Sequence, residues 1–379
     1  RKSAGGTSEK GDHPLLRVHR ICRASEHGFV AAAASAGLTP RAVFDPSANL
    51  LAQEYIREPQ TLTAGLVAAA LPECARLLRR LHDRVPAAAF KRARELGCGD
   101  GHEFDVFETA QHYLGLVRGL NPTGDVSWAA ALPGDVDALV AEAANLAKSL
   151  RARRTLGGWY PAACHNDLVV GNLVRGQVLK GTQQERRLFL IDFEYAAVGD
   201  RCFDLANLCV NADLSPAQTE VVVKHYLAHD GDAADGSATA AAASESRESE
   251  LLARVGLYRV LSDLREGLWA LAHGTTLGPL QGATDGATCK SGLLEPVPAE
   301  GGASSEEGGG KEESGALPKS FYVEYAAKHL DRFRRSLGLS PPKGPGAGSE
   351  AGSGAGSSDQ AGAGARREQL SKWVDLVEA

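Results

Sequence analysis

The stretch ACHNDLVVGNLV, residues 163–174, and the stretch RLFLIDFEYAAVGDRCFDLANLCV, residues 187–210, decide the fold of this chain. The first contains the pattern H-x-D-x-x-x-x-N, formed by His165, Asp167 and Asn172. A carboxylate and an amide at this spacing can meet an acceptor hydroxyl and hold a metal ion against nucleotide phosphates, as phosphoryl transfer requires. The triplet H-x-D alone is weak evidence, because it occurs by chance in chains of this length.

Two short apolar runs surround these groups. Leu168 to Val174 and Leu188 to Ile191 are rich in branched residues, and the polar segment from Arg175 to Arg187 joins them, so they predict two strands of a hairpin. Asp192 and Glu194 follow the second run directly. A loop that precedes the first strand and a carboxylate that follows the second would then lie side by side.

The residue types suggest a role for each polar group. Asp167 is expected to orient the substrate hydroxyl and to accept its proton late in transfer. Asn172 and Asp192 are expected to bind magnesium, which takes few hard oxygen ligands and keeps several waters. Glu194 would face the same metal through water, or would be a surface glutamate at a strand end. His165 would either take part in the chemistry or prop up the loop, and the sequence leaves both open.

The same residues carry a resemblance to a known family. HNDLVVGNLV followed by IDFEYAAVGDRCFDLAN resembles the choline/ethanolamine kinase family, a branch of the aminoglycoside-phosphotransferase and protein-kinase-like superfamily. The letters FEY after the metal aspartate separate this family from protein kinases, which have FG there. The resemblance implies an α+β, bilobal protein-kinase-like fold, with a small mixed N-lobe that is truncated at its N-terminus and a larger, mainly helical C-lobe.

The resemblance also implies a supporting residue for the loop. Asp204, in FDLAN, would hold the catalytic loop from behind. By itself this residue reads equally well as a carboxylate at a helix N-terminus, where the helix dipole favours it.

The nucleotide site is implied by three further segments. HPLLRVHR resembles the core strand of the N-lobe, with Arg17 where protein kinases have their phosphate-binding lysine, and SEHGFVAAAASAGLTP resembles the next helix, with Glu26 as the ion-pair partner. A guanidinium can clamp phosphate oxygens in a bidentate way. LAQEYI resembles the hinge, where Glu54 and Ile56 would offer backbone groups to adenine. The cofactors implied are Mg²⁺ and ATP, the latter as co-substrate.

The acceptor pocket departs from the family. LYRVLSDLREGLWAL and FYVEYAAKHLDRF resemble the two helices that wall the amino-alcohol pocket. Glu266 and Trp269 are three residues apart and so share a helix face, and Tyr325 matches a further aromatic wall. Better-known choline kinases have tryptophan at the position of Glu266 and an acidic residue at that of Asn211. A carboxylate gives a primary ammonium charge and hydrogen bonds, whereas choline uses only charge, so the substrate stays open between choline, ethanolamine and a related amino alcohol.

Composition argues against other classes of partner. The formal net charge is −6 and no dense basic tract occurs, which disfavours nucleic acid or an anionic membrane surface. No signal peptide is recognised and no apolar run approaches about 18 residues, so we expect no membrane insertion. Seven scattered cysteines without a C-x-x-C pair favour a reduced, cytoplasmic compartment. The expected partners are ATP and a small amino alcohol, and a homodimer is compatible with the sequence.

Local patterns predict individual elements. Leu15 to His19 reads as a strand, and Ser25 to Ala36 as a helix, with Ser25 as N-cap and Gly37 as the stop. Val43 to Ile56 reads as a hairpin with a turn at Asp45-Pro46-Ser47, and Thr63 to His82 reads as helical.

Composition also divides the chain into segments. It contains no methionine, so we expect it to begin inside a longer product. Low complexity predicts disorder, because such segments cannot bury enough apolar surface to offset chain entropy. The expected segments are a flexible leader at 1–12, a partial N-lobe at 13–57, a C-lobe at 58–338 with disordered insertions at 230–249 and 275–318, a disordered tail at 341–365, and a short terminal helix at 369–377.

The function that these observations predict is an ATP-dependent kinase that phosphorylates the hydroxyl of choline or ethanolamine, a step that feeds phospholipid head-group synthesis. One alternative is a phosphotransferase acting on an aminoglycoside or a sugar, which shares the chemistry; FEY and Trp269 speak against it. The other is a non-catalytic, pseudokinase-like binding module, suggested by the missing Gly-rich loop and disfavoured by the complete polar set.

Overall fold

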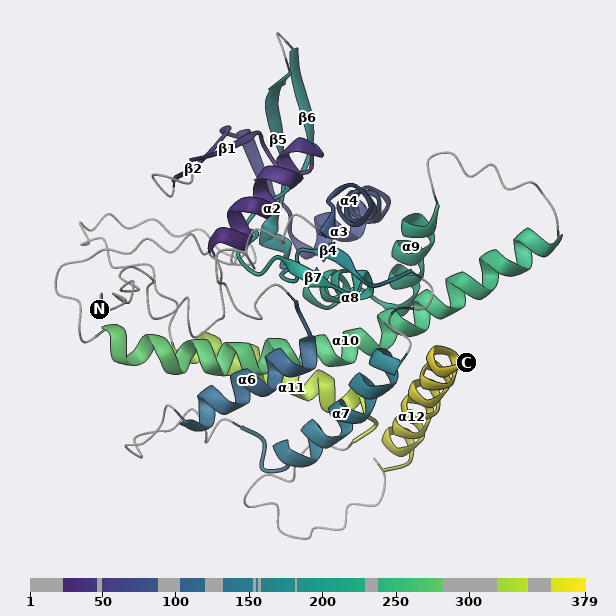
Figure 1. The fold of residues 1–379 in the computed structure, drawn as a ribbon. Helices are drawn as coiled ribbons and strands as arrows, with labels where there is room; N and C mark the ends of the chain where they lie inside the picture. Colours follow the sequence, from purple (N-terminus) through teal and green to yellow (C-terminus); the bar gives the residue numbers. More distant parts are fainter. Residues whose placement is uncertain are drawn as a thin grey trace, which may run out of the picture.

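The computed structural model describes residues 23–45, 50–87, 103–119, 132–152, 155, 158–180, 183–228, 238–281, 319–339 and 356–379. In Figure 1 a small upper lobe combines one helix with short strands, and the larger lobe below it is mainly helical. This is the bilobal α+β fold predicted from the sequence. The predicted strand at Leu15 to His19, and Arg17 within it, lie outside the described residues.

The small lobe begins with helix α2 (Arg23–Ser35). The helix ends as predicted at Gly37, whose backbone φ is +71°, and Leu38 donates its N–H back to the carbonyl of Ala33. Because α2 already begins at Arg23, Ser25 lies inside it, and the prediction of Ser25 as N-cap was wrong.

Two hairpins complete this lobe. Strands β1 (Ala42–Asp45) and β2 (Leu50–Gln53) pair antiparallel, which confirms the first predicted hairpin. Strands β5 (Leu173–Lys180) and β6 (Gln183–Leu190) form the second, with Leu173 opposite Leu190, and β3 (Arg57–Thr61) pairs with the other edge of β5.

The second hairpin differs from its prediction in extent. Its first strand begins at Leu173, because residues 168–172 form a loop that ends in the 3₁₀ turn Val170–Asn172. Both strands also run through most of the polar segment 175–187. The outer half of the ribbon projects from the body in Figure 1, and the backbone ladder continues along it.

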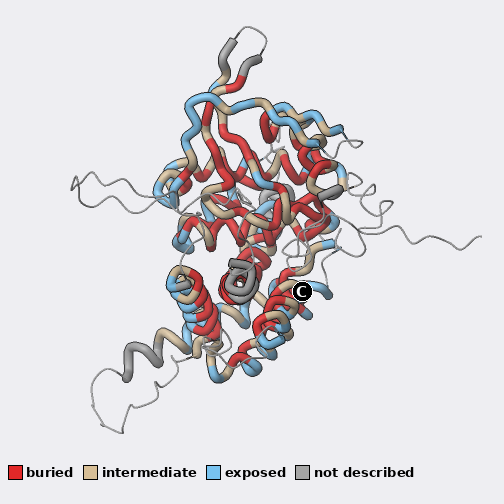
Figure 2. The backbone as a smooth tube through the Cα atoms, turned by 90° about the vertical axis from the view of Figure 1, so that its left-hand side faces the viewer, coloured by how far each residue is buried: buried red, intermediate tan, exposed pale blue. Residues whose placement is uncertain are grey.

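The large lobe is built around helix α10 (Ala238–Gln281), which crosses it from side to side in Figure 1. The helix packs against α6 (Val106–Gly119), α8 (Arg201–Asn211) and α11 (Lys319–Ser336). Its residues from 251 to 274 are almost all buried, and buried backbone runs through the centre of both lobes in Figure 2. The other elements are α3 (Ala64–Ala69), α4 (Leu71–Arg84), α7 (Val136–Ala152), α9 (Pro216–Leu227), α12 (Gly356–Glu378) and the paired strands β4 (Ala162–Cys164) and β7 (Ala197–Gly199).

Helices occupy part of the segments for which we predicted disorder. Helix α10 includes residues 238–249 and 275–281, and α12 includes residues 356–365 as well as the predicted terminal helix at 369–377. The N-terminal part of α10, residues 238–249, is rich in alanine, which has the highest helix propensity, so low complexity there does not prevent a helix. The remainder of these segments lies outside the described residues. Among the helices that are described, none combines the length and apolar character needed to cross a membrane.

Candidate active site

One buried carboxylate holds the loop between β4 and β5. Asp204, in the first turn of α8, accepts the backbone N–H groups of His165 and Asn166, each at 2.8 Å. Two hydrogen bonds to consecutive backbone groups fix the loop conformation from behind, where the resemblance implied that Asp204 would lie. The effect of Asp204 on turnover stays a prediction.

His82 of α4 extends this buried network. Its Nε2 lies 3.0 Å from Asp204 Oδ2, and its Nδ1 lies 2.7 Å from Tyr226 Oη of α9. Burial lowers the pKa of His82, although the hydrogen bond and charge of Asp204 act in the opposite direction. A neutral ring can donate to Asp204 and accept from the Tyr226 hydroxyl, so all three side chains are paired.

His165 lies where it supports the loop. Its ring is fully buried, its Nε2 lies 2.9 Å from the carbonyl oxygen of Ile191, and its ring centroid is 4.8 Å from that of Phe193. Phe193 in turn lies 5.1 Å from Phe29 of α2. Burial also lowers the pKa of His165. Of the two roles left open by the sequence, this geometry favours the structural one.

The hairpin brings the predicted catalytic and metal-binding groups to one place. Asn172 donates its amide hydrogens to the backbone oxygen of Asp167 at 2.8 Å and to its Oδ2 at 3.3 Å. The N–H of Ile191 donates to the backbone oxygen of Asn172 at 3.0 Å, so Asp192 starts beside the loop. Asp192 is exposed and has a backbone φ of +61°, and Glu194 is half-buried two residues later.

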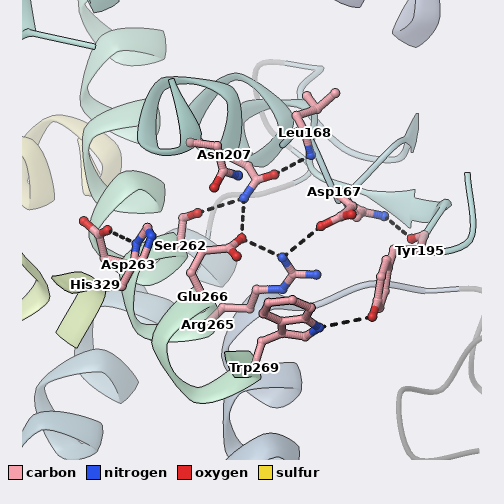
Figure 3. Close-up of polar contacts among 12 residues, drawn as sticks. Asp167, Leu168, Tyr195, Asn207, Ser262, Asp263, Arg265, Glu266, Trp269 and His329 are labelled. Carbon is pink, nitrogen blue, oxygen red and sulfur yellow. Dashed lines mark hydrogen bonds and ion pairs between the residues drawn. The ribbon is translucent and has the colours of Figure 1, made fainter. Parts of the chain in front are cut away.

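A buried ion pair lies on the other side of Asp167 (Figure 3). Nη1 of Arg265 is 3.3 Å from Asp167 Oδ1 and donates to Glu266 Oε1 at 2.6 Å. Arg265 and Glu266 each have 1% of their surface exposed. Asn172 contacts one oxygen of Asp167 and Arg265 contacts the other, so this carboxylate is held between the predicted metal ligand and the ion pair.

Asn207 of α8 connects the ion pair to the loop. Its Nδ2 donates to Glu266 Oε1 at 2.9 Å and to Ser262 Oγ at 3.0 Å, and its Oδ1 accepts the N–H of Leu168 at 2.6 Å. Figure 3 shows these three bonds converging on one amide. A single side chain therefore couples α8, α10 and the residue after Asp167.

The predicted acceptor residues lie together, and one of them, Glu266, also pairs with a cation of the protein itself. The Tyr325 hydroxyl is 3.2 Å from Glu266 Oε2 and 3.3 Å from Asn211 Oδ1. Glu266, however, is buried and already bound by Arg265, Asn207 and Tyr325. In this structure the cation that Glu266 meets is Arg265, the residue before it on α10, and contact between Glu266 and a substrate ammonium stays a prediction.

Aromatic rings line the same region. Trp269 donates Nε1 to Tyr195 Oη at 3.3 Å, and its ring centroid is 6.2 Å from that of Tyr325. The guanidinium carbon of Arg265 lies 5.2 Å from the centroid of the Tyr195 ring. Trp269 and Tyr325 therefore lie close together, Tyr195, the last letter of FEY, adds a third ring, and the contact of these rings with a substrate stays a prediction.

A sequence profile of the phosphotransferase enzyme family matches residues 15–242, which contain the loop, the hairpin and Asp204. The chain belongs to this family. The residues Arg265, Glu266, Trp269 and Tyr325 lie beyond the matched range.

Individual relatives carry more specific names. The human choline/ethanolamine kinase is 28% identical over 189 residues, which cover 44% of this chain and 43% of that protein. Protein LicA of Haemophilus influenzae is 36% identical over 63 residues, 17% of this chain and 21% of that protein. The chain thus aligns with less than half the length of these relatives.

Solved structures of this phosphotransferase type share the fold. A choline/ethanolamine kinase family protein from Mesorhizobium loti superposes with a TM-score of 0.54 at 18% identity, covering 94% of this chain and 85% of that one. An ethanolamine kinase from Plasmodium vivax gives a TM-score of 0.53 at 18% identity, covering 83% and 73%. At these identities the likeness establishes the fold alone.

The electrostatics of the site follow from burial and from the ion pair. Burial raises the pKa of Asp167 to about 6; the Arg265 guanidinium opposes this shift and the charge of Glu266 adds to it. Burial acts on Glu266 in the same direction, but the charges of Arg265 and His329 and the hydrogen bonds from Arg265 and Asn207 outweigh it, so the pKa of Glu266 is lowered. At neutral pH, Asp167, Glu266 and Arg265 together carry two negative charges and one positive charge.

The predicted nucleotide-binding residues are only partly described. Glu26 lies on α2, but its predicted partner Arg17 is outside the described residues. Glu54 is paired with Arg41, with 3.0 Å between Arg41 Nε and Glu54 Oε2, and Ile56 packs closely against Gly176 of β5. Their contact with adenine stays a prediction.

Sequence reasoning did not identify four residues of this region: His82, Tyr195, Asn207 and Arg265. A signal exists for Arg265, because Ser262, Arg265, Glu266 and Trp269 recur at spacings of three or four on one face of a helix. The sequence holds no such signal for His82, which occupies an ordinary polar position of the amphipathic helix α4.

Proposed function

We propose that this protein is a kinase that transfers the γ-phosphate of ATP to the hydroxyl group of a small amino alcohol, choline or ethanolamine. Membership of the phosphotransferase enzyme family supports phosphoryl transfer, and the names of the relatives support the acceptor class. One observation carries the choice of acceptor: a cluster of net negative charge, lined by aromatic rings, lies beside Asp167. A cationic ligand balances such a cluster, and the faces of Trp269 and Tyr325 attract an ammonium group.

In this proposal the carboxylate of Asp167 positions the nucleophile. The acceptor hydroxyl donates its hydrogen to Asp167, which orients the oxygen toward phosphorus and takes the proton late in transfer. The contacts of Asn172 with Oδ2 and of Arg265 with Oδ1 hold the carboxylate in one orientation. With a pKa of about 6, Asp167 is mostly ionised at neutral pH and can act as this acceptor.

The residues present fit a magnesium ion. The amide nitrogen of Asn172 is bonded to Asp167, which leaves its amide oxygen to face a cation, and Asp192 offers an exposed carboxylate next to it. Asn172 and Asp192 would hold the ion directly and Glu194 through water, which matches the preference of magnesium for few hard oxygen ligands. When bound, the ion neutralises charge on the nucleotide phosphates.

A coupled ADP-release assay with choline, ethanolamine and an aminoglycoside in parallel tests this function. We expect turnover with one or both amino alcohols, none with the aminoglycoside, and loss of turnover when EDTA removes magnesium. Turnover with the aminoglycoside alone would contradict the acceptor class. Nucleotide binding without turnover on any acceptor would favour a non-catalytic binding module instead.

A further inference from the structure

Arg265 occupies the position that a substrate cation would be expected to take. Its guanidinium carbon is 5.2 Å from the centroid of the Tyr195 ring, within the range of a cation–π contact. Its Nη1 contacts Glu266 Oε1 at 2.6 Å and Asp167 Oδ1 at 3.3 Å. An aromatic face and two carboxylates are the groups that a quaternary ammonium relies on, because it has no hydrogen to donate. Here an internal cation already uses all three.

On the other side of Glu266, the Tyr325 hydroxyl faces more acceptor oxygens than it can serve. The Tyr325 hydroxyl has one hydrogen but lies 3.2 Å from Glu266 Oε2 and 3.3 Å from Asn211 Oδ1, so it can satisfy only one of them. If the amide of Asn211 is turned round, its nitrogen donates to Tyr325 and its own oxygen is left without a donor. In both orientations one acceptor oxygen remains open, and a ligand N–H group would fill it.

The opposite imbalance exists at Arg265. Its Nε and Nη2 are buried and have no hydrogen-bond partner among the residues that the structure describes. Buried donors without a partner are unfavourable, and an oxygen atom of a ligand next to Asp167 would satisfy them. The hydroxyl oxygen of an acceptor, with its hydrogen directed at Asp167, is such an atom.

We propose that Arg265 is a specificity-determining residue: its guanidinium fills the cation position at Tyr195, Glu266 and Asp167, so the ammonium of the acceptor must be held by N–H hydrogen bonds at the oxygens of Tyr325, Asn211 and Glu266. This inference rests on the proposed function and narrows it to amino alcohols with at least one N–H hydrogen. Ethanolamine and its mono- and dimethyl derivatives meet this requirement as ammonium ions, whereas choline does not.

The test is a methylation series. The full chain is assayed for ADP release, and by calorimetry for binding, with ethanolamine, N-methylethanolamine, N,N-dimethylethanolamine and choline. We expect kcat/KM to change little over the first two methyl groups. It should fall about tenfold or more at the third, because the last charge-assisted hydrogen bond is lost there.

Two variants assign the preference to Arg265. The double variant Arg265→Met with Glu266→Gln removes one charge of each sign, so the net charge of the cluster is unchanged and no carboxylate is left buried without a partner. It uncovers the Tyr195 ring and should raise the choline-to-ethanolamine ratio of kcat/KM about tenfold. Glu266→Gln alone keeps Arg265 over the ring and should not move the ratio toward choline.

A third variant tests the ammonium end and does not depend on the ion pair. Tyr325→Phe keeps the ring and removes the hydroxyl, so kcat/KM for ethanolamine should fall about tenfold while that for choline stays within about twofold. Tyr322→Phe, one turn earlier on α11, is the matched control and should leave the ratio unchanged. Thermal melting monitored by circular dichroism checks that each variant is folded.

The outcomes separate this inference from the function on which it rests. If the wild type prefers choline, or if Tyr325→Phe lowers kcat/KM equally for ethanolamine and choline, then Arg265 does not set the specificity. The assignment as a kinase would still stand in that case. If no member of the series binds or reacts, both the function and the inference are overturned.

Discussion

Asp167 meets two demands that act against each other. Asp167 has a higher pKa in the folded protein than in the unfolded chain, where it is near 4. Below pH 4 the side chain is protonated in both states, and its contribution to stability is then fully present. That contribution is lost as the pH rises through about 6, so at neutral pH the ionised, partly buried side chain lowers the free energy of unfolding. In the proposed function, the same ionised form receives a proton from the acceptor.

We therefore predict that Asp167→Asn stabilises the protein while it removes activity. At pH 7.5 the free energy of unfolding should rise by about 1–3 kcal/mol, since one pKa unit corresponds to about 1.4 kcal/mol. Near pH 4 the difference should disappear, because the wild-type side chain is then protonated. Urea denaturation at the two pH values measures this, and a variant less stable than the wild type at pH 7.5 would contradict it.

The same pKa predicts the acid limb of the rate profile. kcat/KM should fall with a slope of one as the pH drops below about 6, because protonated Asp167 cannot take the hydroxyl proton. Glu266→Gln removes a negative charge that raises this pKa, so the acid limb should move to lower pH. Initial rates between pH 5 and 8 test both statements, and a limb that moves to higher pH in the variant would refute the second.

Asp192 and Asp167 should differ in what their removal costs. Asp192→Ala takes away a metal ligand and should abolish turnover and weaken magnesium-dependent nucleotide binding. Asp167→Ala should lower kcat by about 10²–10⁴ with nucleotide affinity retained, because only the acceptor loses its partner. Fluorescence titration with a nucleotide analogue, beside the kinetic assay, distinguishes the two. Near-normal turnover of Asp192→Ala at ordinary magnesium would show that the ligand assignment is wrong.

At the scale of elements, α10 and α11 pack closely together and carry the residues of the proposed acceptor site. A Cβ placed on Gly267 would lie 2.7 Å from Cγ of Leu330 and 3.3 Å from the carbonyl oxygen of Ala326, so the two helices meet where only hydrogen fits. Trp269 follows Gly267 on α10, and Tyr325 precedes Ala326 on α11. The distance between the two helices at Gly267 therefore sets the distance between the rings of Trp269 and Tyr325.

Gly267→Ala is expected to push the two helices apart. The free energy of unfolding should fall by about 1–3 kcal/mol through overpacking, and KM for the acceptor should rise while KM for ATP is unchanged. Gly115→Ala in α6 is the matched control: nothing lies within 4 Å of its added Cβ, and replacing a mid-helix glycine should stabilise the protein by about 0.5–1 kcal/mol. Equal effects of the two substitutions would argue against the packing explanation.

Local sequence patterns predicted the elements better than the contacts between them. Helix α2, the hairpin β1–β2 and the ends of β5 and β6 nearest the loop follow from short-range signals: a glycine stop, a turn and runs of branched residues. The helical parts of 238–249 and 356–365 were missed, because composition was judged without the helix that continues from each of them.

The polar contacts of the site were predictable only in part, for a physical reason. Asp167, Asn172 and Asp192 lie within 25 residues of one another on a hairpin, so spacing alone brings them together. Arg265 reaches Asp167 across 98 residues and His82 reaches Asp204 across 122, through packing of separate helices. The ion pair between Glu266 and its neighbour Arg265 was not predicted for the same reason, since Arg265 turns inward through the packing of α10.

At the scale of the whole molecule, α12 closes the large lobe on the side of α7 and α10 (Figure 1). Trp373 lies against Gly256 of α10, where an added Cβ would be 2.7 Å from the ring. Ser149 of α7 donates its hydroxyl to Glu378 Oε1 at 2.6 Å, and Val377 is almost fully buried. The contact at Gly256 is about two and a half turns before Arg265, so α12 and the proposed acceptor site use different parts of α10.

Trp373→Ala should release α12 without changing the chemistry. We expect a loss of about 1–3 kcal/mol in the free energy of unfolding, since the ring is half-buried, together with faster cleavage of the C-terminal segment by a protease. kcat and both KM values should stay within about twofold. Lys372→Ala, next to it on the exposed side, is the control and should behave like the wild type. Large changes in acceptor KM for Trp373→Ala would show that α12 shapes the pocket after all.

The contacts of helix α10 depend on the direction in which each of its side chains points around the helix axis. Arg254 and Tyr258 both bond to Asp200, Ser262 bonds to Asn207, and Arg265 and Trp269 reach the catalytic side. Inserting or deleting one residue in this stretch would turn everything beyond it by about 100°, a displacement that no repacking of side chains can absorb. Substitutions at single positions are local by comparison. Length changes in the gene are therefore expected to be tolerated in the exposed part of α10 before residue 250 and selected against from Arg254 to Trp269.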